Sequence, residues 1–202
     1  MIVKFDHISF SCTFAEEEMV VKDFTGYEEV FSEKNLCNLE IKEPFLRVKQ
    51  DTHNIFMLQK ENCYPVEITS YAQCQQSERR LNVEADRICI KTADVELTEQ
   101  LYKSLGFRGE NGILEYKPLL DSAVVKLQII QDSHAPTTTC LDDAGYGILA
   151  FVVDNSKKQK KQLEEAGFAV TEIQELTVNE KPLKICFAKS KAGDLIELIG
   201  IR

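Results

Sequence analysis

A single carboxylate lies in a stretch of sequence that is otherwise suited to burial. Glu197 stands in the middle of the apolar run 195–201, and a second apolar run, 184–188, precedes it. Residues 190–194 between the two runs predict a hairpin turn. An ionised carboxylate in an apolar interior is costly unless it meets a cation, a metal ion, a proton or a water-filled cavity. Glu197 is therefore the first candidate for a catalytic or ligand-binding residue.

Polar residues occupy a comparable place in two earlier strand-like runs. Glu67 lies in the run 66–69, and Gln128 lies in the run 126–130. Each of these runs closes a unit in which an opening strand is followed by a helix and three strands. The opening strands are expected at 5–10, 85–90 and 147–152, and the helices at 14–24, 95–105 and 157–166. The second and third helices end at matching Gly-Phe pairs, which are typical helix stops.

The sequence thus predicts three βαβββ units, of which the first is the most divergent. Its three later strands are expected at 45–49, 54–59 and 65–71. Several motifs of these units are similar to those of the vicinal oxygen chelate superfamily, which contains glyoxalases, methylmalonyl-CoA epimerases, extradiol dioxygenases and bleomycin-resistance proteins. The motifs are Asp6-His7-Ile8, Asp86-Arg87-Ile88, Leu105-Gly106-Phe107, Ala150-Phe151-Val152-Val153-Asp154, Ala166-Gly167-Phe168 and Gly193-Asp194-Leu195-Ile196-Glu197-Leu198.

The resemblance implies an α+β fold in which repeated βαβββ modules form curved, cup-shaped mixed sheets. Residues 1–72 are expected to be a divergent N-terminal module, and the polar stretch 73–82 is expected to be a linker. Residues 83–202 are then a glyoxalase-like domain of two modules, 83–132 and 145–202, that together form one complete cup.

The superfamily holds a divalent metal between the first and last strands of each module. Carried over to this sequence, the metal positions are His7 and Glu67 in the first module, Arg87 and Gln128 in the second, and Ile148 and Glu197 in the third. Arginine cannot ligate a cation and isoleucine has no ligand atom, so Gln128 and Glu197 are too few for a tight site. We therefore expect Arg87, Gln128 and Ile148 to line a pocket, with Arg87 paired to Glu197.

The first module alone makes only half a cup, so it must pair with another module of this chain or with a second copy in a homodimer. Pairing with the third module would bring His7, Glu67 and Glu197 together as ligands for a divalent metal such as Zn, Ni, Mn or Fe. Simpler interpretations remain open at this point. His7 could be a hydrogen-bonded strand histidine, Glu67 could be exposed, and Glu197 could form a structural ion pair.

Three classes of function follow from these patterns. The first prediction is a small-molecule-binding protein with a cup-shaped pocket and without the full metal site of the superfamily. The alternative is a metal-dependent isomerase, lyase or dioxygenase that acts on a small oxygenated substrate, with Glu197 as the proton-transferring residue. The third class is a structural or regulatory protein whose cup is filled by its own side chains.

Composition narrows the list of partners. The chain has 202 residues, of which 44% are hydrophobic and 28% charged, and it carries a net charge of -9. The only basic cluster, 157–161, lies at an expected helix start, so nucleic acid is not an expected partner. No secretion signal or membrane-spanning run is visible, which indicates a cytoplasmic protein without a membrane partner. The seven cysteines show no Cys-x-x-Cys spacing and are expected to be reduced.

Overall fold

The computed structural model describes residues 1–76, 80–121, 123–178 and 180–200. The first module contains β1 (Ile2–Thr13), α1 (Glu17–Asp23), β2 (Glu28–Cys37), a short 3-10 helix η1 (Glu40–Phe45), β3 (Thr52–Gln59) and β4 (Val66–Tyr71). A short strand, β5 (Leu81–Val83), leads into the second module, which contains β6 (Ile88–Thr92), α2 (Val95–Ser104), β7 (Arg108–Glu110), β8 (Ile113–Tyr116) and β9 (Val125–Gln131). The third contains β10 (Gly145–Val153), α3 (Ser156–Glu165), β11 (Ala169–Val170), β12 (Gln174–Val178), β13 (Lys181–Lys189) and β14 (Leu195–Gly200).

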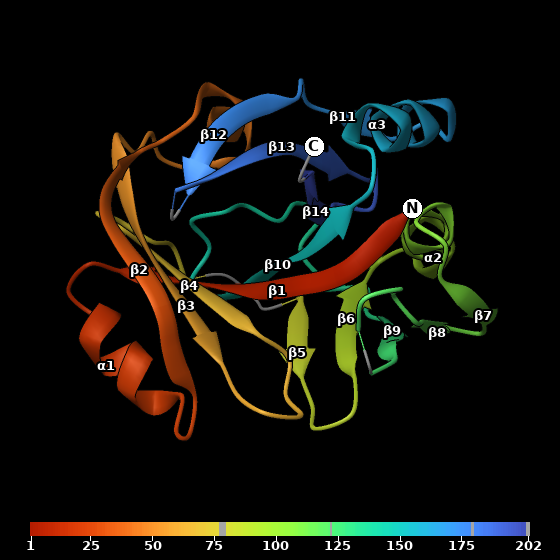
Figure 1. The fold of residues 1–202 in the computed structure, drawn as a ribbon. Helices are drawn as coiled ribbons and strands as arrows, with labels where there is room; N and C mark the ends of the chain where they lie inside the picture. The colour runs from red at the N-terminus through yellow and green to blue at the C-terminus, as the bar shows by residue number, and fades with distance from the viewer. Residues whose placement is uncertain (77–79, 122, 179, 201–202) are drawn as a thin grey trace.

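The strands of all three modules are arranged in the same order. The order is β1-β4-β3-β2 in the first module, β6-β9-β8-β7 in the second, and β10-β14-β13-β12 in the third. In each module the first strand runs parallel to the last, so one concave face carries the side chains of both. The predicted α+β fold of repeated βαβββ modules with curved mixed sheets is therefore confirmed (Figure 1).

The modules pair differently from the expectation. β1 pairs antiparallel with β10, so the first and third modules share one strongly curved nine-stranded sheet (Figure 1). The second module and β5 form a separate five-stranded sheet. The cup expected from the second and third modules is therefore not formed. Two modules that are distant in sequence build it instead, because the free edge of β10 is taken by β1.

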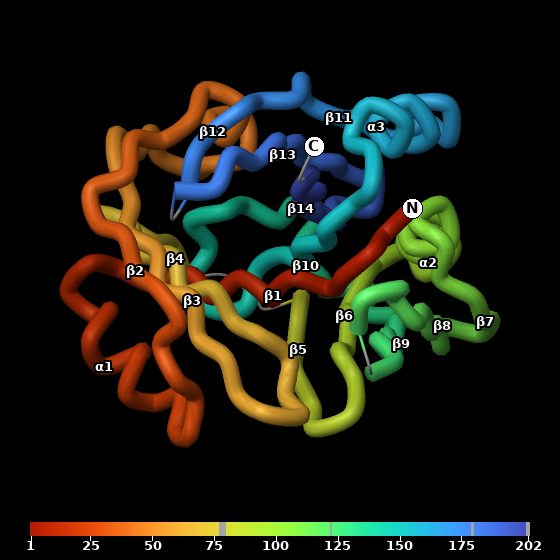
Figure 2. The backbone as a smooth tube through the Cα atoms, viewed as in Figure 1, coloured from red at the N-terminus to blue at the C-terminus, as the bar shows by residue number. Residues whose placement is uncertain are grey.

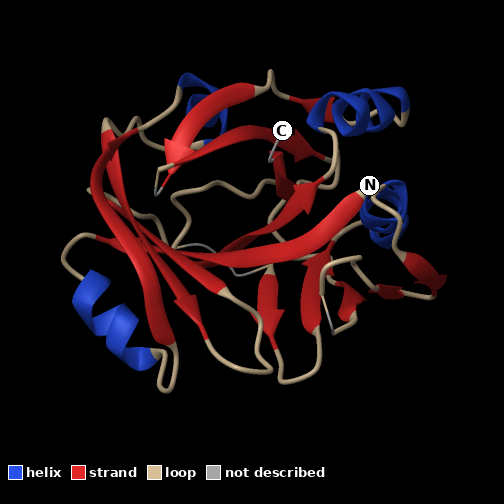
Figure 3. Cartoon of the chain, viewed as in Figure 1, coloured by secondary structure: helices blue, strands red, loops and turns tan. Residues whose placement is uncertain are grey.

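Two segments of the first module also differ from the expected strands. Residues 45–49 are not a strand, since Phe45 ends η1 and residues 46–49 form an irregular segment (Figure 3). β2 was not predicted, because its sequence EEVFSEKNLC is mostly polar and most of its side chains are exposed. β2 lies at the edge of the sheet and forms backbone hydrogen bonds with β3 only. Edge strands are often polar, so the apolar pattern that predicts a buried strand is missing from this sequence.

Among the described residues, the apolar core that joins the two sheets is one of three hydrophobic clusters. One face of β1, β10 and β14 packs against the five-stranded sheet and against α2 and α3, which lie next to each other on one side of the molecule (Figure 1). Fully buried members include Ile8, Phe151, Ile88 and Leu101. Within the described ranges, no helix has the length and apolar character needed to cross a membrane.

Arg80, in the expected linker 73–82, is one member of a buried ion pair with Asp194. Residues 77–79 of this linker lie outside the described residues. The Arg80 side chain is 4% exposed, and its Nη2 donates to Asp194 Oδ1 at 2.6 Å. Its other guanidinium nitrogens donate to the carbonyls of Lys91, Pro136 and Ala192. Asp194 Oδ2 accepts from Thr98 and Ser190. Every polar atom of the pair has a partner, so the network ties the second module to the β13–β14 turn.

Replacing Arg80 by Ala should lower the free energy of unfolding by about 3–5 kcal/mol, because it leaves Asp194 as an unpaired buried charge. Urea unfolding followed by circular dichroism measures this change. Arg87→Ala is the matched control and should change the free energy of unfolding far less, since the Arg87 side chain is 36% exposed and pairs with exposed Asp86. Equal effects of the two substitutions would contradict the assignment of the buried pair to Arg80.

Candidate functional site

The hollow of the nine-stranded sheet contains a cavity of about 580 Å³, here called the central cavity. β2 and β3 line one side, and β12 and β13 line the other, so the first and third modules both contribute. Most of the wall is aliphatic, with Leu36, Ile55, Met57, Leu183 and Ile199 among its residues. A cavity of this size and character is typical of a small-molecule site. The side chains of the described residues therefore leave the cup open rather than filling it.

Three ionisable side chains meet on the floor of the central cavity. The Nε2 atom of His7 lies 3.9 Å from Glu67 Oε1 and 3.9 Å from Glu197 Oε2. Strand register explains the convergence: His7 on β1 lies opposite Ala150 on β10, and Ala150 lies opposite Glu197 on β14. Because Ala150 has only a methyl group, the longer side chains on either side can approach each other above it. We call His7, Glu67 and Glu197 the floor cluster.

Asp6 orients the His7 ring through a bulge in β1. Phe5 lies opposite Phe151 and His7 lies opposite Ala150, so Asp6 is an extra residue on β1 and both Asp6 and His7 line the cavity. His7 Nδ1 and Asp6 Oδ2 are 3.0 Å apart. Nδ1 is therefore the donor of this hydrogen bond, and Nε2 is directed toward the two glutamates. Nε2 is buried and has no hydrogen-bond partner among the described residues.

The carboxylates around His7 change its acid–base behaviour. Burial alone would lower the pKa of His7, but Glu67, Asp6 and Glu197 together raise it to about 9. Burial acts in the opposite direction on Glu197 and raises its pKa, with a further contribution from Glu67 and opposition from His7 and Lys42. Burial would also raise the pKa of Asp6, but His7 and Lys4 lower it to about 2. In the absence of a metal ion, the floor cluster thus favours a protonated imidazole.

An insertion between β2 and β3 places a lysine, Lys42, at the central cavity. Residues 38–51 join β2 to β3, whereas residues 111–112 alone join the equivalent strands of the second module. The insertion contains η1 and packs against β13 through the contact of Phe45 with Phe187. Figure 2 shows the path of its backbone. Lys42 on η1 lines the cavity, and its Nζ lies 3.4 Å from Nε2 of buried His53. Burial and Lys42 lower the pKa of His53 to about 3, so this imidazole is neutral.

Lys42 and His53 were not identified from the sequence. Residues 50–54 read as a polar turn, whereas His53 lies in β3 and is 4% exposed. The strand expected at 54–59 therefore began two residues later than β3, which starts at Thr52.

None of the three residues expected in the pocket, Arg87, Gln128 and Ile148, lines the central cavity. Arg87 pairs with Asp86 and donates to Gln128, on the face of the five-stranded sheet that is turned away from the apolar core. Arg87 is therefore not the partner of Glu197, and neither Arg87 nor Gln128 lines the central cavity. The expectation was wrong because it followed from pairing the second and third modules. Ile148 is buried among apolar side chains on β10, at the position equivalent to His7, and does not line the cavity.

The donor set of the floor cluster suits a divalent cation, but its spacing is wide. One imidazole and two carboxylates are ligand types for Zn, Mn or Fe, and a carboxylate behind the histidine is a common feature of metal-bound histidines. Among the described residues, however, no group of three or more His, Cys, Asp and Glu side chains is arranged as a metal site. The fourth position is occupied by Ile148, which has no ligand atom.

Known proteins that are similar to this chain are found among solved structures. No family model and no curated protein matches the chain. Among solved structures, methylmalonyl-CoA epimerase from Mycobacterium tuberculosis matches at 11% identity and a TM-score of 0.45, over 100% of this chain and 89% of the epimerase. Glyoxalase I from Zea mays matches at 15% identity and a TM-score of 0.40, over 97% and 67% of the two chains.

A third match, the glyoxalase family protein from Enterococcus faecalis, is 23% identical with a TM-score of 0.43 and covers 57% of this chain and 96% of its own. These proteins belong to the superfamily that the sequence motifs resemble. At such identities the likeness is one of fold alone.

In metal-free protein, the pKa values of the two cavity histidines should be displaced in opposite directions from the usual value of about 6.5. His7 should lose its proton near pH 9, and its contribution to stability should be complete below about pH 6.5 and lost as the pH rises through 9. His53 should stay neutral until about pH 3, and its contribution should be lost as the pH falls below 6.5. Two-dimensional ¹H–¹⁵N NMR of the imidazole rings measures both, with His7→Gln and His53→Gln for assignment. Two midpoints near 6.5 would contradict the described environment.

Proposed function

We propose that this protein binds a small oxygenated molecule in the central cavity. The apolar part of the ligand would pack against the aliphatic walls formed by β2, β3, β12 and β13. Its polar end would face the floor cluster of His7, Glu67 and Glu197. The first and third modules both contribute walls and floor, so the site exists only when they share one sheet.

The observation that carries this proposal is the unpartnered Nε2 of His7. A buried polar atom without a hydrogen bond is costly, and such atoms in folded proteins are usually satisfied by water, an ion or a ligand. With Nδ1 directed to Asp6 and the pKa raised to about 9, Nε2 carries a proton at neutral pH. It would therefore donate to a carbonyl, carboxylate or hydroxyl oxygen of the ligand.

Charges at the site support a polar ligand that offers both acceptor and donor groups. Glu67 and Glu197 would accept hydrogen bonds from hydroxyl groups, and Lys42 at the edge of the cavity would face an oxygen that carries negative charge. Glu197 is also suited to proton transfer, because burial moves its pKa upward toward neutral pH. A proton could thus pass between Glu197 and a ligand atom that lies next to the oxygen bound by His7.

The second candidate is a metal-dependent isomerase, lyase or dioxygenase. His7, Glu67 and Glu197 would be the ligands, and the ion would polarise an oxygen of the substrate. The specific observation in its favour is that Asp6 fixes Nδ1 of His7 and leaves Nε2 directed between two carboxylates. Against it stand the 3.9 Å separations and the raised pKa of His7, since the ring must lose its proton to bind a metal.

Ligand binding is tested by blocking the cavity. Leu36→Trp should fill part of the central cavity and abolish binding of small ketones, hydroxy acids and phenols that are found to bind the unmodified protein by saturation-transfer NMR. Ile113→Trp is the matched control, because Ile113 is 52% exposed on β8 and lies outside the cavity. It should leave binding unchanged. Binding that survives Leu36→Trp, or no binding by any member of the panel, would count against the proposal.

Metal analysis separates the two candidates. Protein purified without a histidine tag and incubated with Zn, Ni, Mn or Fe(II) should retain less than one equivalent after gel filtration if the metal-free function is correct. Retention of one equivalent that is lost in His7→Ala and kept in His53→Ala would instead support the metal-dependent enzyme. His53 is a suitable control because it is buried in the same cavity but does not belong to the floor cluster.

A further inference from the structure

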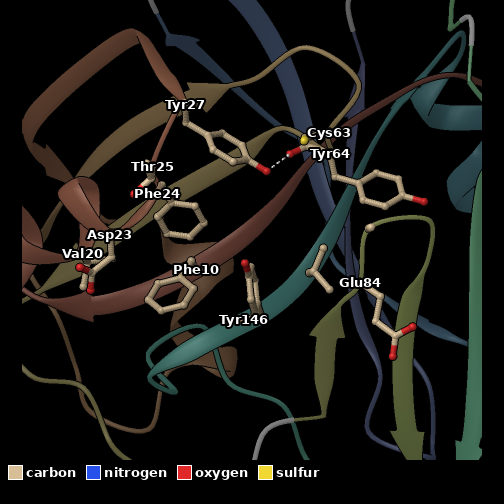
Figure 4. A pocket seen from close by; sticks show the side chains of 12 residues that line it. Phe10, Val20, Asp23, Phe24, Thr25, Tyr27, Cys63, Tyr64, Glu84 and Tyr146 are labelled. Carbon is tan, nitrogen blue, oxygen red and sulfur yellow. Dashed lines mark hydrogen bonds between the residues drawn. The ribbon is translucent and has the colours of Figure 1, made fainter.

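A second cavity lies on the other side of β1, well separated from the floor cluster. It has a volume of about 640 Å³ and is bounded by α1 and the following turn, by β1 and β10, and by the turn between β5 and β6 (Figure 4). None of the residues that line it also lines the central cavity. We call it the aromatic cleft. The first and second modules approach each other there, at a place that the proposed function does not use.

Four aromatic rings form one wall of the aromatic cleft. Phe24 stands in the middle and contacts Phe10, Tyr27 and Tyr146, with ring planes at 81–88° to its own and centroids 5.5–6.4 Å away. Phe10 and Tyr146 are also perpendicular, with centroids 5.1 Å apart. All four side chains are only half-buried (Figure 4). Rings at right angles to their neighbours present both faces and edges to the cleft, as in the aromatic cages that bind alkylammonium groups.

The charged groups of the cleft are acidic. Asp23 and Glu84 line it from opposite modules, and no lysine or arginine side chain is among its lining residues. The carboxylate of Asp23 has no hydrogen bond or ion pair with any described residue, whereas Glu84 forms an ion pair with Arg87, whose Nε lies 3.8 Å from Glu84 Oε2. Lys60 Nζ lies 5.7 Å from the centroid of the Tyr27 ring and donates to the carbonyl of Thr25, so Tyr27 already contacts a cation of the chain and Phe10, Phe24 and Tyr146 are the rings left for a ligand.

We propose that the aromatic cleft binds a small organic cation, namely an alkylammonium or quaternary ammonium compound. The ring faces are the negative part of the aromatic quadrupole and attract a cation that can be desolvated against them. Asp23 and Glu84 add a favourable potential at the two ends, and they repel anions. A neutral ligand of the same shape gains only the apolar contact.

Choline and 3,3-dimethyl-1-butanol test this directly, because they have the same shape and differ in whether nitrogen or carbon carries the three methyl groups. In ¹H NMR, the methyl signal of bound choline should move upfield through the ring currents of the cleft. Choline should bind about tenfold or more tightly than the alcohol, as expected from a desolvated cation–π contact. Equal affinity of the two would reduce the cleft to an apolar groove and overturn the proposal, as would the absence of any shift with choline.

Variants locate the binding. Asp23→Asn combined with Glu84→Gln should weaken choline binding about threefold or more and leave the alcohol unaffected, since both residues are exposed and the fold does not depend on them. Asp51→Asn combined with Glu96→Gln removes the same net charge outside the cleft and should change neither affinity. Phe24→Leu should reduce the upfield shift. If both double variants weaken choline binding equally, the attraction is due to the net charge of -9 and the cleft is not the site.

Discussion

The antiparallel pairing of β1 with β10 is the interaction on which the rest of the structure depends. On one face it places Phe5 opposite Phe151 and Ile8 opposite Leu149, and these side chains form the core that also receives the second module. On the other face it places His7 opposite Ala150. The same ladder of hydrogen bonds therefore creates the hydrophobic core and brings the floor cluster together.

The pairing of β1 with β10 also buries the ionisable side chains of the floor cluster, which affects their protonation. Three ionisable side chains in the floor cluster share one small volume with Asp6, and the carboxylates around His7 raise its pKa, so that it retains a proton well above its usual pH range. A second buried pair, Arg80 with Asp194, is fully hydrogen-bonded and has a structural role. The contrast between the two is informative: the pair with every polar atom satisfied holds modules together, whereas the cluster with an unpartnered Nε2 has room for a ligand.

Much of the fold could be predicted from the sequence because its signals are local. The Gly-Phe helix stops, the apolar strands and the single carboxylate in the last strand all depend on neighbouring residues, and His7, Glu67 and Glu197 followed from their places in the repeated module. The pairing of modules could not be predicted in this way. Three modules of the same strand order offer similar edges, and the choice between them depends on packing across the whole chain. Arg87 was paired with Glu197 and Arg80 was overlooked for that reason, while His53 and Lys42 depend on an insertion that has no counterpart in the second module.

The central claim is that the first and third modules form one cup with His7 beside the third module. The most direct measurement is the nuclear Overhauser effect between the imidazole protons of His7 and the methyl group of Ala150, observed in protein labelled with ¹³C-methyl alanine. The account predicts a strong cross-peak, which should be absent in Ala150→Gly, together with α-proton contacts between β1 and β10. Absence of the cross-peak, with contacts of β10 to β6 in place of those to β1, would contradict the account.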